Sequence, residues 1–242
     1  MLEQLRQRLQ ALQKTVGIGD GPGALPLGIA PIDAALGGGL ARGALHEIAA
    51  VSEAHLAAAT GFTLGLTSLP SPRLRGEGER VCWIAEDMAL AESGAPYGPG
   101  LDAFGLAPER LLTVSAAQPR DLLWAMEEAL RCRAVGAVIG ELRDSAVGTV
   151  ALRRLSLAAA ESGALALLLR SAPSREASTA ATRWIVGTAS KTCFAAQLVR
   201  NRRGPLGSWI LEWSDSDERF LLATPAQPVA APALDRSHRQ VA

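Results

Sequence analysis

The sequence predicts an α/β protein in which a mostly parallel sheet is sandwiched by helices, with antiparallel strands added near the C-terminus and a separate N-terminal helix. Short apolar runs alternate with longer helical stretches between residues 45 and 170. Strands that are apolar throughout are typical of a parallel sheet covered by helices on both faces. After residue 170 the β-rich runs lie close together and are separated by turn residues, which favours antiparallel pairing.

Residues 1–16 are predicted to form an amphipathic helix. Leucines recur there at spacings of three and four, which places them along one stripe of the helix: Leu2, Leu5, Leu9 and Leu12. Residues 17–24 are rich in Gly and Pro and are predicted to be a linker. The stripe packs either onto its own domain or, because the linker frees the helix, onto a partner, and both interpretations stay open at this point.

Residues 25–222 are predicted to form the core domain. Its first strands correspond to the runs LHEIAA, VCWIAE, LLTV, GAVIG and LALLLR. The clearest helix runs from Pro119 to Cys132, with the proline in its first turn and Arg131 near its end, where positive charge is favourable. A second helix, from Ser145 to Glu161, is followed by a Ser-Gly pair that is typical of a glycine C-cap.

The rest of the core is predicted to be antiparallel. The runs TRWIVGTA, TCFAAQLVR and GSWILEW are β-rich, and the turn RNRRGPLG separates the last two. Trp184, Trp209 and Trp213 lie on these strands, and we expect them to pack in the core or at the sheet edge rather than to stack on bases. Residues 223–242 are rich in Ala and Pro, and we expect this tail to be disordered.

Composition narrows the class of protein. The chain has 242 residues, of which 48% are hydrophobic, and its 24 basic residues balance 24 acidic ones. This balance argues against dedicated nucleic-acid binding, so any DNA contact is expected to be weak, indirect or confined to a local patch. Cys82, Cys132 and Cys193 lie far apart and indicate neither disulfides nor a zinc site. The polar N-terminus is not a signal peptide and no apolar stretch spans a membrane, so we expect a cytoplasmic protein.

The segment after the first core strand lies where such a fold commonly holds phosphate, but its residues do not suit that role. A phosphate loop of the form GxxxxGK[ST] uses glycines for close backbone approach, a lysine for the phosphate oxygens and a hydroxyl for Mg²⁺. The corresponding segment here is AAVSEAHLAAATG, with Glu53 and His55 near the expected position of the phosphates. We therefore expect neither a bound cofactor nor a metal ion at this loop.

Residues elsewhere in the sequence do not replace the missing loop. Lys191, in GTASKT, lies between two strand-like segments instead of before a helix. Gly140 stands where a strand-end aspartate would orient Mg²⁺, and Glu141, one residue later, is expected to face the other side as a loop or helix-entry carboxylate. Glu86 follows a strand, where general bases often lie, but it has no nucleotide to act on. The sequence predicts that the chain is not an enzyme.

A basic turn is the best candidate for binding that does not involve catalysis. Arg200, Arg202 and Arg203 surround the glycine turn between two predicted strands. The planar guanidinium of arginine matches both phosphate and carboxylate geometry, so DNA phosphates and an acidic partner surface are both candidate ligands. A solvated turn without a ligand is the alternative.

Several segments together resemble the RecA core. GIAPIDAALGGGLARGALHEI resembles the RecA segment that leads into its first strand and the strand's glutamate, here Glu47. The order of VCWIAEDMAL, Tyr97 and the following helix-strand segments is also similar to RecA. The resemblance implies that Glu86 stands where RecA has its catalytic glutamate and that Tyr97 lies near its adenine-contacting tyrosine. The phosphate-loop lysine and strand-end aspartate of RecA are missing here, which argues against ATPase and strand-exchange activity.

Finer detail resembles the ImuA family over about residues 25–215, through ALHEI, DLLWAMEEALR, AATRW and RNRRGPLGSWILEW. The resemblance implies an accessory role in DNA-damage-induced (SOS) mutagenesis and translesion synthesis. It implies as partners an ImuB-type Y-family-like polymerase subunit and an error-prone replicative-type polymerase, with RecA as a further candidate. Two alternatives remain, namely a DNA-dependent ATPase or recombinase-like enzyme with a remodelled site around Glu86 and Tyr97, and a modulator of RecA filaments.

Overall fold

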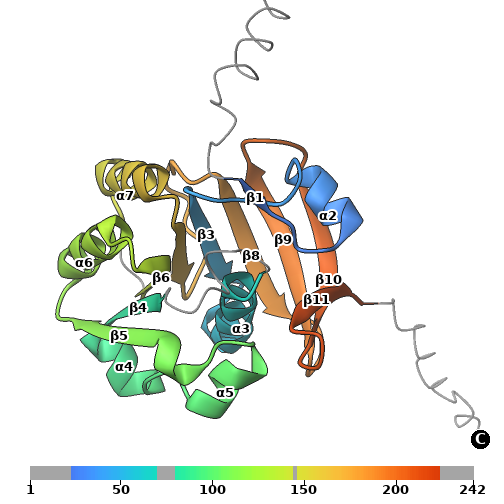
Figure 1. Ribbon diagram of the computed structural model, residues 1–242, viewed down its shortest axis with the longest axis horizontal. Helices are drawn as coiled ribbons and strands as arrows, with labels where there is room; N and C mark the ends of the chain where they lie inside the picture. Colours follow the sequence, from blue (N-terminus) through green and yellow to red (C-terminus); the bar gives the residue numbers. More distant parts are fainter. Residues whose placement is uncertain (1–22, 70–79, 144–145, 224–242) are drawn as a thin grey trace, which may run out of the picture.

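A nine-stranded sheet forms the centre of the computed structural model, which describes residues 23–69, 80–143 and 146–223 (Figure 1). The strand order is β11-β10-β9-β8-β3-β7-β6-β4-β5. Strands β3 to β8 pair in parallel. Their bounds are Leu45–Ala50 (β3), Arg80–Glu86 (β4), Leu111–Ala116 (β5), Val135–Leu142 (β6), Leu165–Arg170 (β7) and Thr182–Thr188 (β8). Each predicted apolar run is therefore a strand, and the predicted parallel sheet is confirmed.

The remaining strands of this sheet are antiparallel, as the turn residues predicted. Strands β9 (Cys193–Asn201) and β10 (Gly207–Ser214) follow β8 in the sheet, and β11 (Arg219–Leu222) adds an edge strand that the sequence analysis did not identify. Trp184 and Trp213 are buried and contact neighbouring aromatic rings, and Trp209 packs against the same core. The expectation that these tryptophans are packing residues is confirmed.

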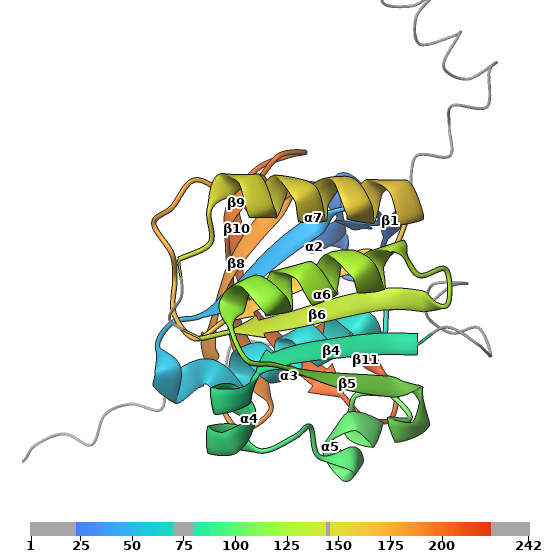
Figure 2. The same ribbon diagram turned by 90° about the vertical axis from the view of Figure 1, so that its left-hand side faces the viewer.

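Two helices cover one face of the sheet (Figure 2). Helix α6 (Pro119–Arg131) matches its predicted range closely, whereas α7 (Thr149–Ser162) begins four residues later than predicted, after Gly148. Gly163 ends α7 in the left-handed region at a φ of 73°, which confirms the predicted glycine C-cap. Glu127 of α6 forms ion pairs with Arg131 and with Arg154 of α7, so the two helices are joined by charge as well as by apolar packing.

Helix α3 (Leu56–Thr67) covers the other face of the sheet. It follows directly after the short 3₁₀ turn η1 (Glu53–His55). Its Phe62 packs on Trp184 and on Phe220 of β11. Helices α4 (Asp87–Ser93) and α5 (Gly98–Ala103) and the turn η2 (Pro108–Arg110) follow β4 along the chain. These elements leave the carboxyl ends of β4 and β6 accessible beside α3.

The glycine-rich segment before β3 folds into a small unit on the α3 side. A two-stranded ribbon of β1 (Ala24–Leu25) and β2 (Leu40–Ala41) encloses α2 (Ala30–Ala35). Gly39 has a φ of 129°, and a Cβ at this position would lie 2.3 Å from the carbonyl oxygen of Leu25. The turn into β2 therefore requires glycine.

The predicted N-terminal helix, with Leu2, Leu5, Leu9 and Leu12, lies outside the described residues, as does nearly all of the predicted disordered tail. Within the described ranges, no helix has the length and apolar character needed to cross a membrane.

Candidate functional site

The loop between β3 and α3 lies where a parallel α/β fold commonly binds phosphate. Residues 51–55 include neither glycine nor a cationic lysine or arginine. The N-terminus of a helix attracts anions through its free N–H groups, but the Glu53 side chain, 79% exposed, stands directly before α3. His55 is turned toward β8, where its Nδ1 accepts a hydrogen bond from the backbone N–H of Thr188 at 3.1 Å. A phosphate at this loop would meet the Glu53 carboxylate and no lysine or arginine from the loop itself.

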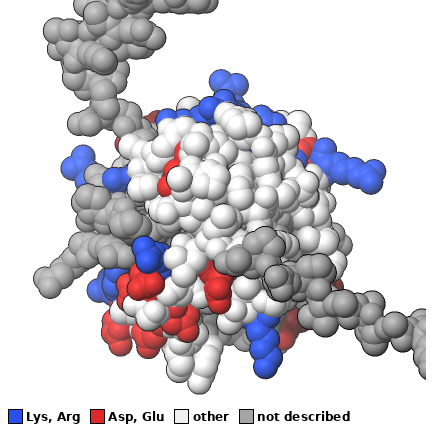
Figure 3. Space-filling view, turned by 90° about the vertical axis from the view of Figure 1, so that its right-hand side faces the viewer, with Lys and Arg blue, Asp and Glu red and all other residues white. Residues whose placement is uncertain are grey.

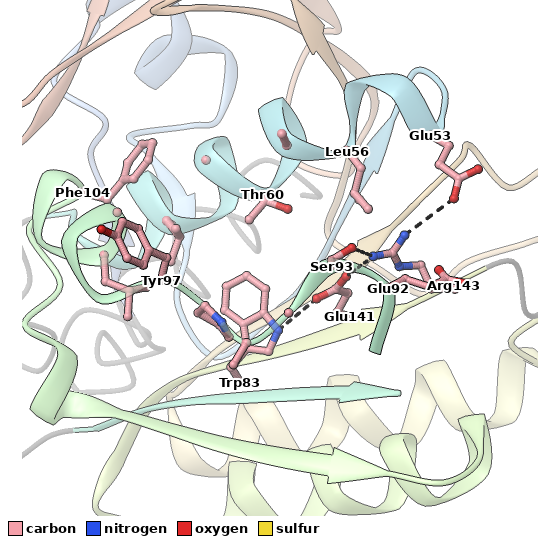
Figure 4. Close-up of a pocket in the computed structure, with 18 residues that line it drawn as sticks. Glu53, Leu56, Thr60, Trp83, Glu92, Ser93, Tyr97, Phe104, Glu141 and Arg143 are labelled. Carbon is pink, nitrogen blue, oxygen red and sulfur yellow. Dashed lines mark hydrogen bonds and ion pairs between the residues drawn. The ribbon is translucent and has the colours of Figure 1, made fainter. Parts of the chain in front are cut away.

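A cavity of about 610 Å³ lies beside this loop (Figure 4). It is bounded by α3, by the segment from Glu92 to Phe104 and by the carboxyl ends of β4 and β6, and we call it the β4–β6 cavity. Apolar side chains line one part of it: Leu56, Leu64, Trp83, Leu101 and Phe104. The polar part is lined by Glu53, Glu92, Ser93, Glu141 and Arg143. Its shape and mixed lining are typical of a binding site for an organic group.

Arg143, directly after β6, organises the polar part of the cavity. Its guanidinium forms ion pairs with Glu141 at 3.1 Å and with Glu53 at 3.7 Å, and it donates a hydrogen bond to Ser93 Oγ at 2.5 Å. Its backbone N–H donates to Glu86 Oε1 at 2.9 Å. These contacts join the β3–α3 loop, β4, α4 and β6 around one cation, whose side chain is only 15% exposed.

The charges around Arg143 are unbalanced. Glu53, Glu92 and Glu141 face the cavity with Arg143, so three carboxylates surround one guanidinium. Glu141 is also held from the neighbouring strand β4, because Trp83 Nε1 donates a hydrogen bond to its Oε2 at 3.2 Å. The surplus of negative charge favours a cationic or neutral occupant and opposes a triphosphate.

The expectation that Glu141 is a loop or helix-entry carboxylate is wrong, whereas the expectation that it faces the other side of the chain from residue 140 agrees with the structure. Glu141 lies within β6 and shares the α3-facing side of that strand with Ala137 and Ile139. Gly140 has the opposite orientation, since a Cβ there would lie 2.2 Å from Met126 Sδ of α6. An aspartate at residue 140 would therefore face α6, and it is Glu141 that faces the cavity.

The two residues expected from the RecA resemblance have different positions. Tyr97, directly before α5, lies on the cavity rim with 74% of its surface exposed. Glu86 ends β4 and contacts the cavity through Arg143. Arg143 and Trp83 were missed by sequence reasoning, because their roles depend on which segments the fold brings together. The one sequence feature that could have pointed to Arg143 is its position two residues after Glu141, near the end of a predicted strand.

The basic turn does not belong to this cavity. Arg200 lines a separate pocket on the opposite face of the sheet, together with Arg170 and Arg183. Arg203 lies near Gly37, and the backbone N–H of Arg202 bonds to the Ala181 carbonyl. Within the described part of the chain, no three His, Cys, Asp or Glu side chains are grouped so as to hold a metal ion.

The fold and the cavity together define an α/β protein that has the usual ligand-binding edge of a parallel sheet but an acidic polar region in place of a cationic phosphate loop. No family model matches the sequence. The chain is 30% identical over 156 residues to Protein ImuA of Caulobacter vibrioides, in the strains NA1000 / CB15N and ATCC 19089 / CIP 103742 / CB 15. The match covers 64% of this chain and 59% of each relative, so it spans less than two thirds of their length. The resemblance to the ImuA family is thereby confirmed.

Proposed function

We propose that the chain is an accessory protein of DNA-damage-induced mutagenesis that acts by binding other proteins and not by hydrolysing nucleotide. The similarity to Protein ImuA supports the biological role. The charge of the β4–β6 cavity supports the mode of action, because Glu53, Glu92 and Glu141 oppose a single arginine where a nucleotide enzyme needs positive charge. This charge arrangement is the observation that carries the proposal.

The partners follow from the family resemblance. An ImuB-type Y-family-like polymerase subunit is the first, an error-prone replicative-type polymerase the second, and RecA a further candidate. The leucine stripe of Leu2, Leu5, Leu9 and Leu12 is proposed to contact one of them, because a linker of eight residues separates it from the core. Contact with DNA is proposed to be weak or indirect, in line with the zero net charge.

Binding of Mg²⁺-ATP, measured by calorimetry with and without single-stranded DNA, tests the absence of nucleotide chemistry. We expect a Kd no tighter than about 1 mM, equivalent to about −4 kcal/mol, because the one cation of the cavity, Arg143, is already paired with Glu141 and Glu53. Tyr97→Ala and its matched control Tyr97→Phe separate an aromatic contact from a change in folding. A micromolar Kd that Tyr97→Ala abolishes and Tyr97→Phe preserves would replace this proposal with the remodelled ATPase.

Co-purification with the ImuB-type subunit tests the role in mutagenesis. The full chain is expected to retain the subunit, and failure of the folded chain to do so would remove the proposal. RecA filament assembly, followed with and without the chain, tests the filament modulator separately. Shortened filaments together with no retention of the polymerase subunit would favour that alternative.

A further inference from the structure

The sheet is covered unevenly on the face that carries α6 and α7. These helices pack on β3 to β7, whereas the outward side chains of β8, β9 and β10 on the same face remain partly exposed. Ile185 and Val199 are half-buried there, and Ile210, in the neighbouring strand, is 43% exposed. The antiparallel register places Ile210 opposite Ala195 and Ile185 opposite Gln197, so Ile185 and Ile210 point to the same face of the sheet, with the exposed Gln197 beside them on that face.

Three arginines converge at one end of this surface. Arg170 of β7, Arg183 of β8 and Arg200 of β9 line a pocket of about 350 Å³, which we call the arginine pocket. Its other lining residues are Glu47, Ala49, Pro173, Ser174, Ile185 and Val199. Glu47 is the single carboxylate among these lining residues.

Glu47 and Arg183 are already fully engaged with each other and with the neighbouring loop. Arg183 Nε donates to Glu47 Oε2 at 2.8 Å, and its two terminal nitrogens donate to the carbonyl oxygens of Ser174 and Glu176 at 3.1 and 3.0 Å. Glu47 also accepts a hydrogen bond from Ser178 Oγ. The carboxylate of Glu176 is engaged by the Val147 N–H at 3.1 Å. Among the described residues, the carboxylates of Glu47 and Glu176 thus already accept hydrogen bonds from the protein itself.

Arg200 is brought into the pocket by an irregularity of the sheet. Arg183 pairs with Arg200 and Trp184 pairs with Leu198, so Val199 is an extra residue in β9. Such a bulge redirects the side chains beside it, and here Val199 and Arg200 both line the pocket. The Nε of Arg200 is buried and has no hydrogen-bond partner among the described residues. A buried donor without a partner is unfavourable, and a carboxylate that contacts the guanidinium of Arg200 would offset that cost through its charge.

We propose that the arginine pocket and the adjoining aliphatic surface bind a segment of a partner protein that carries an acidic side chain next to an aliphatic one. The carboxylate would accept hydrogen bonds from Arg200, and the aliphatic group would cover Ile185 and Val199, which line the same pocket. The inference deepens the proposed function and rests on it, since it gives the chemistry by which a mutagenesis partner is recognised.

A protein carboxylate fits these observations better than a nucleic-acid backbone does. The pocket opens onto aliphatic groups, whereas single strands are usually bound through aromatic side chains on which bases stack. The basic residues are balanced in number by acidic ones, so the composition does not favour binding to successive phosphates. One carboxylate flanked by apolar groups matches both the charge and the surface.

Affinity for the purified ImuB-type subunit, measured with the full chain, tests the inference. Arg200→Glu is expected to weaken binding about tenfold or more, because it places a carboxylate where the partner's carboxylate would lie. Arg120→Glu makes the same charge change on a side chain that is 77% exposed in α6, and we expect it to alter the Kd by less than about threefold. Arg200→Gln, which keeps a donor without the charge, is expected to have an intermediate effect. The melting temperature of each variant shows whether it is folded.

The outcomes separate this inference from the proposed function. Binding by the wild type that Arg200→Glu and Arg120→Glu leave equally intact overturns the inference and keeps the proposed function. Absence of binding by the wild type removes both. If Arg200→Glu impairs binding to an oligothymidine and not to the subunit, the pocket serves nucleic acid and the inference is wrong.

Discussion

Gly140 illustrates how one missing side chain serves the packing of the sheet. It lies in the middle of the buried β6, where a Cβ would be 2.2 Å from Met126 Sδ and 2.9 Å from its Cε. Met126 is fully buried between α6 and the sheet and therefore has little room to move. The glycine thus allows α6 to approach β6 closely. This packing explains the glycine without reference to the Mg²⁺-orienting aspartate that was expected at this position.

Gly140→Ala is accordingly expected to lower the free energy of unfolding by about 1–3 kcal/mol, as overpacking of a core does. Chemical denaturation followed by circular dichroism measures the change. Gly148→Ala is the matched control, since no atom lies within 4 Å of a Cβ there. Equal stability of the two variants would contradict the close approach of α6.

The orientation of Glu141 was not available from the sequence for a physical reason. A strand with polar and apolar faces reveals its orientation by alternation, but β6 is buried along its whole length and its residues are apolar on both sides. The sequence therefore predicted the strand and not which face meets α3. Arg143 was missed for a related reason, because its partners Glu53 and Ser93 come from distant parts of the chain.

Among the helices and strands, the long ones with a regular apolar pattern were predicted from the sequence and the short ones were not. Long apolar strands and the amphipathic α6 were predicted closely, because each carries several residues of one periodicity. The short α2, α4 and α5 have six or seven residues each, too few for a helical period to stand out. The four-residue strand β11 was not predicted for the same reason, although its Phe220 packs against Phe62 in the core.

His46 joins three strands, and burial makes this junction sensitive to pH. Its Nε2 bonds to the Ala41 carbonyl of β2 at 2.8 Å, and its Nδ1 to Thr182 Oγ of β8 at 2.7 Å. Burial lowers the pKa of His46 from 6.5 to about 4, against a smaller opposing effect of the bond to Ala41. Between these two values the unfolded chain binds a proton that the folded chain excludes, so stability falls as the pH falls through this window.

The free energy of unfolding is therefore expected to decrease by about 2 kcal/mol between pH 7 and pH 5 through His46 alone. Urea denaturation at several pH values measures the slope. His46→Gln keeps a polar side chain without a titrating ring, and it should flatten the pH dependence even if it lowers the stability at pH 7. An unchanged slope in this variant would mean that other groups cause the loss.

Over the whole molecule, the numbers of acidic and basic residues are equal, but the two kinds of charge gather in different places. On the side that Figure 3 shows, most side chains are uncharged, and the Lys and Arg side chains lie mainly near the margins. The β4–β6 cavity is acidic, and the arginine pocket on the opposite face of the sheet is basic. Among the described residues, the acidic cavity and the arginine-lined pocket are thus separated by the sheet.

Binding to single-stranded DNA should therefore depend only weakly on salt. If Arg200, Arg202 and Arg203 are the residues that meet phosphates, the slope of log K against log salt is expected to be about −2, as three neutralised phosphates give on a single strand. Replacing Arg202 and Arg203 by Ala should reduce the slope to about −1, because a single phosphate contact would remain. Fluorescence anisotropy of a labelled oligothymidine between 50 and 200 mM salt, about the range over which counterion release is usually followed, measures both slopes. A slope several times steeper would require a basic surface that the balanced composition does not provide, and DNA would then have to be treated as a principal ligand.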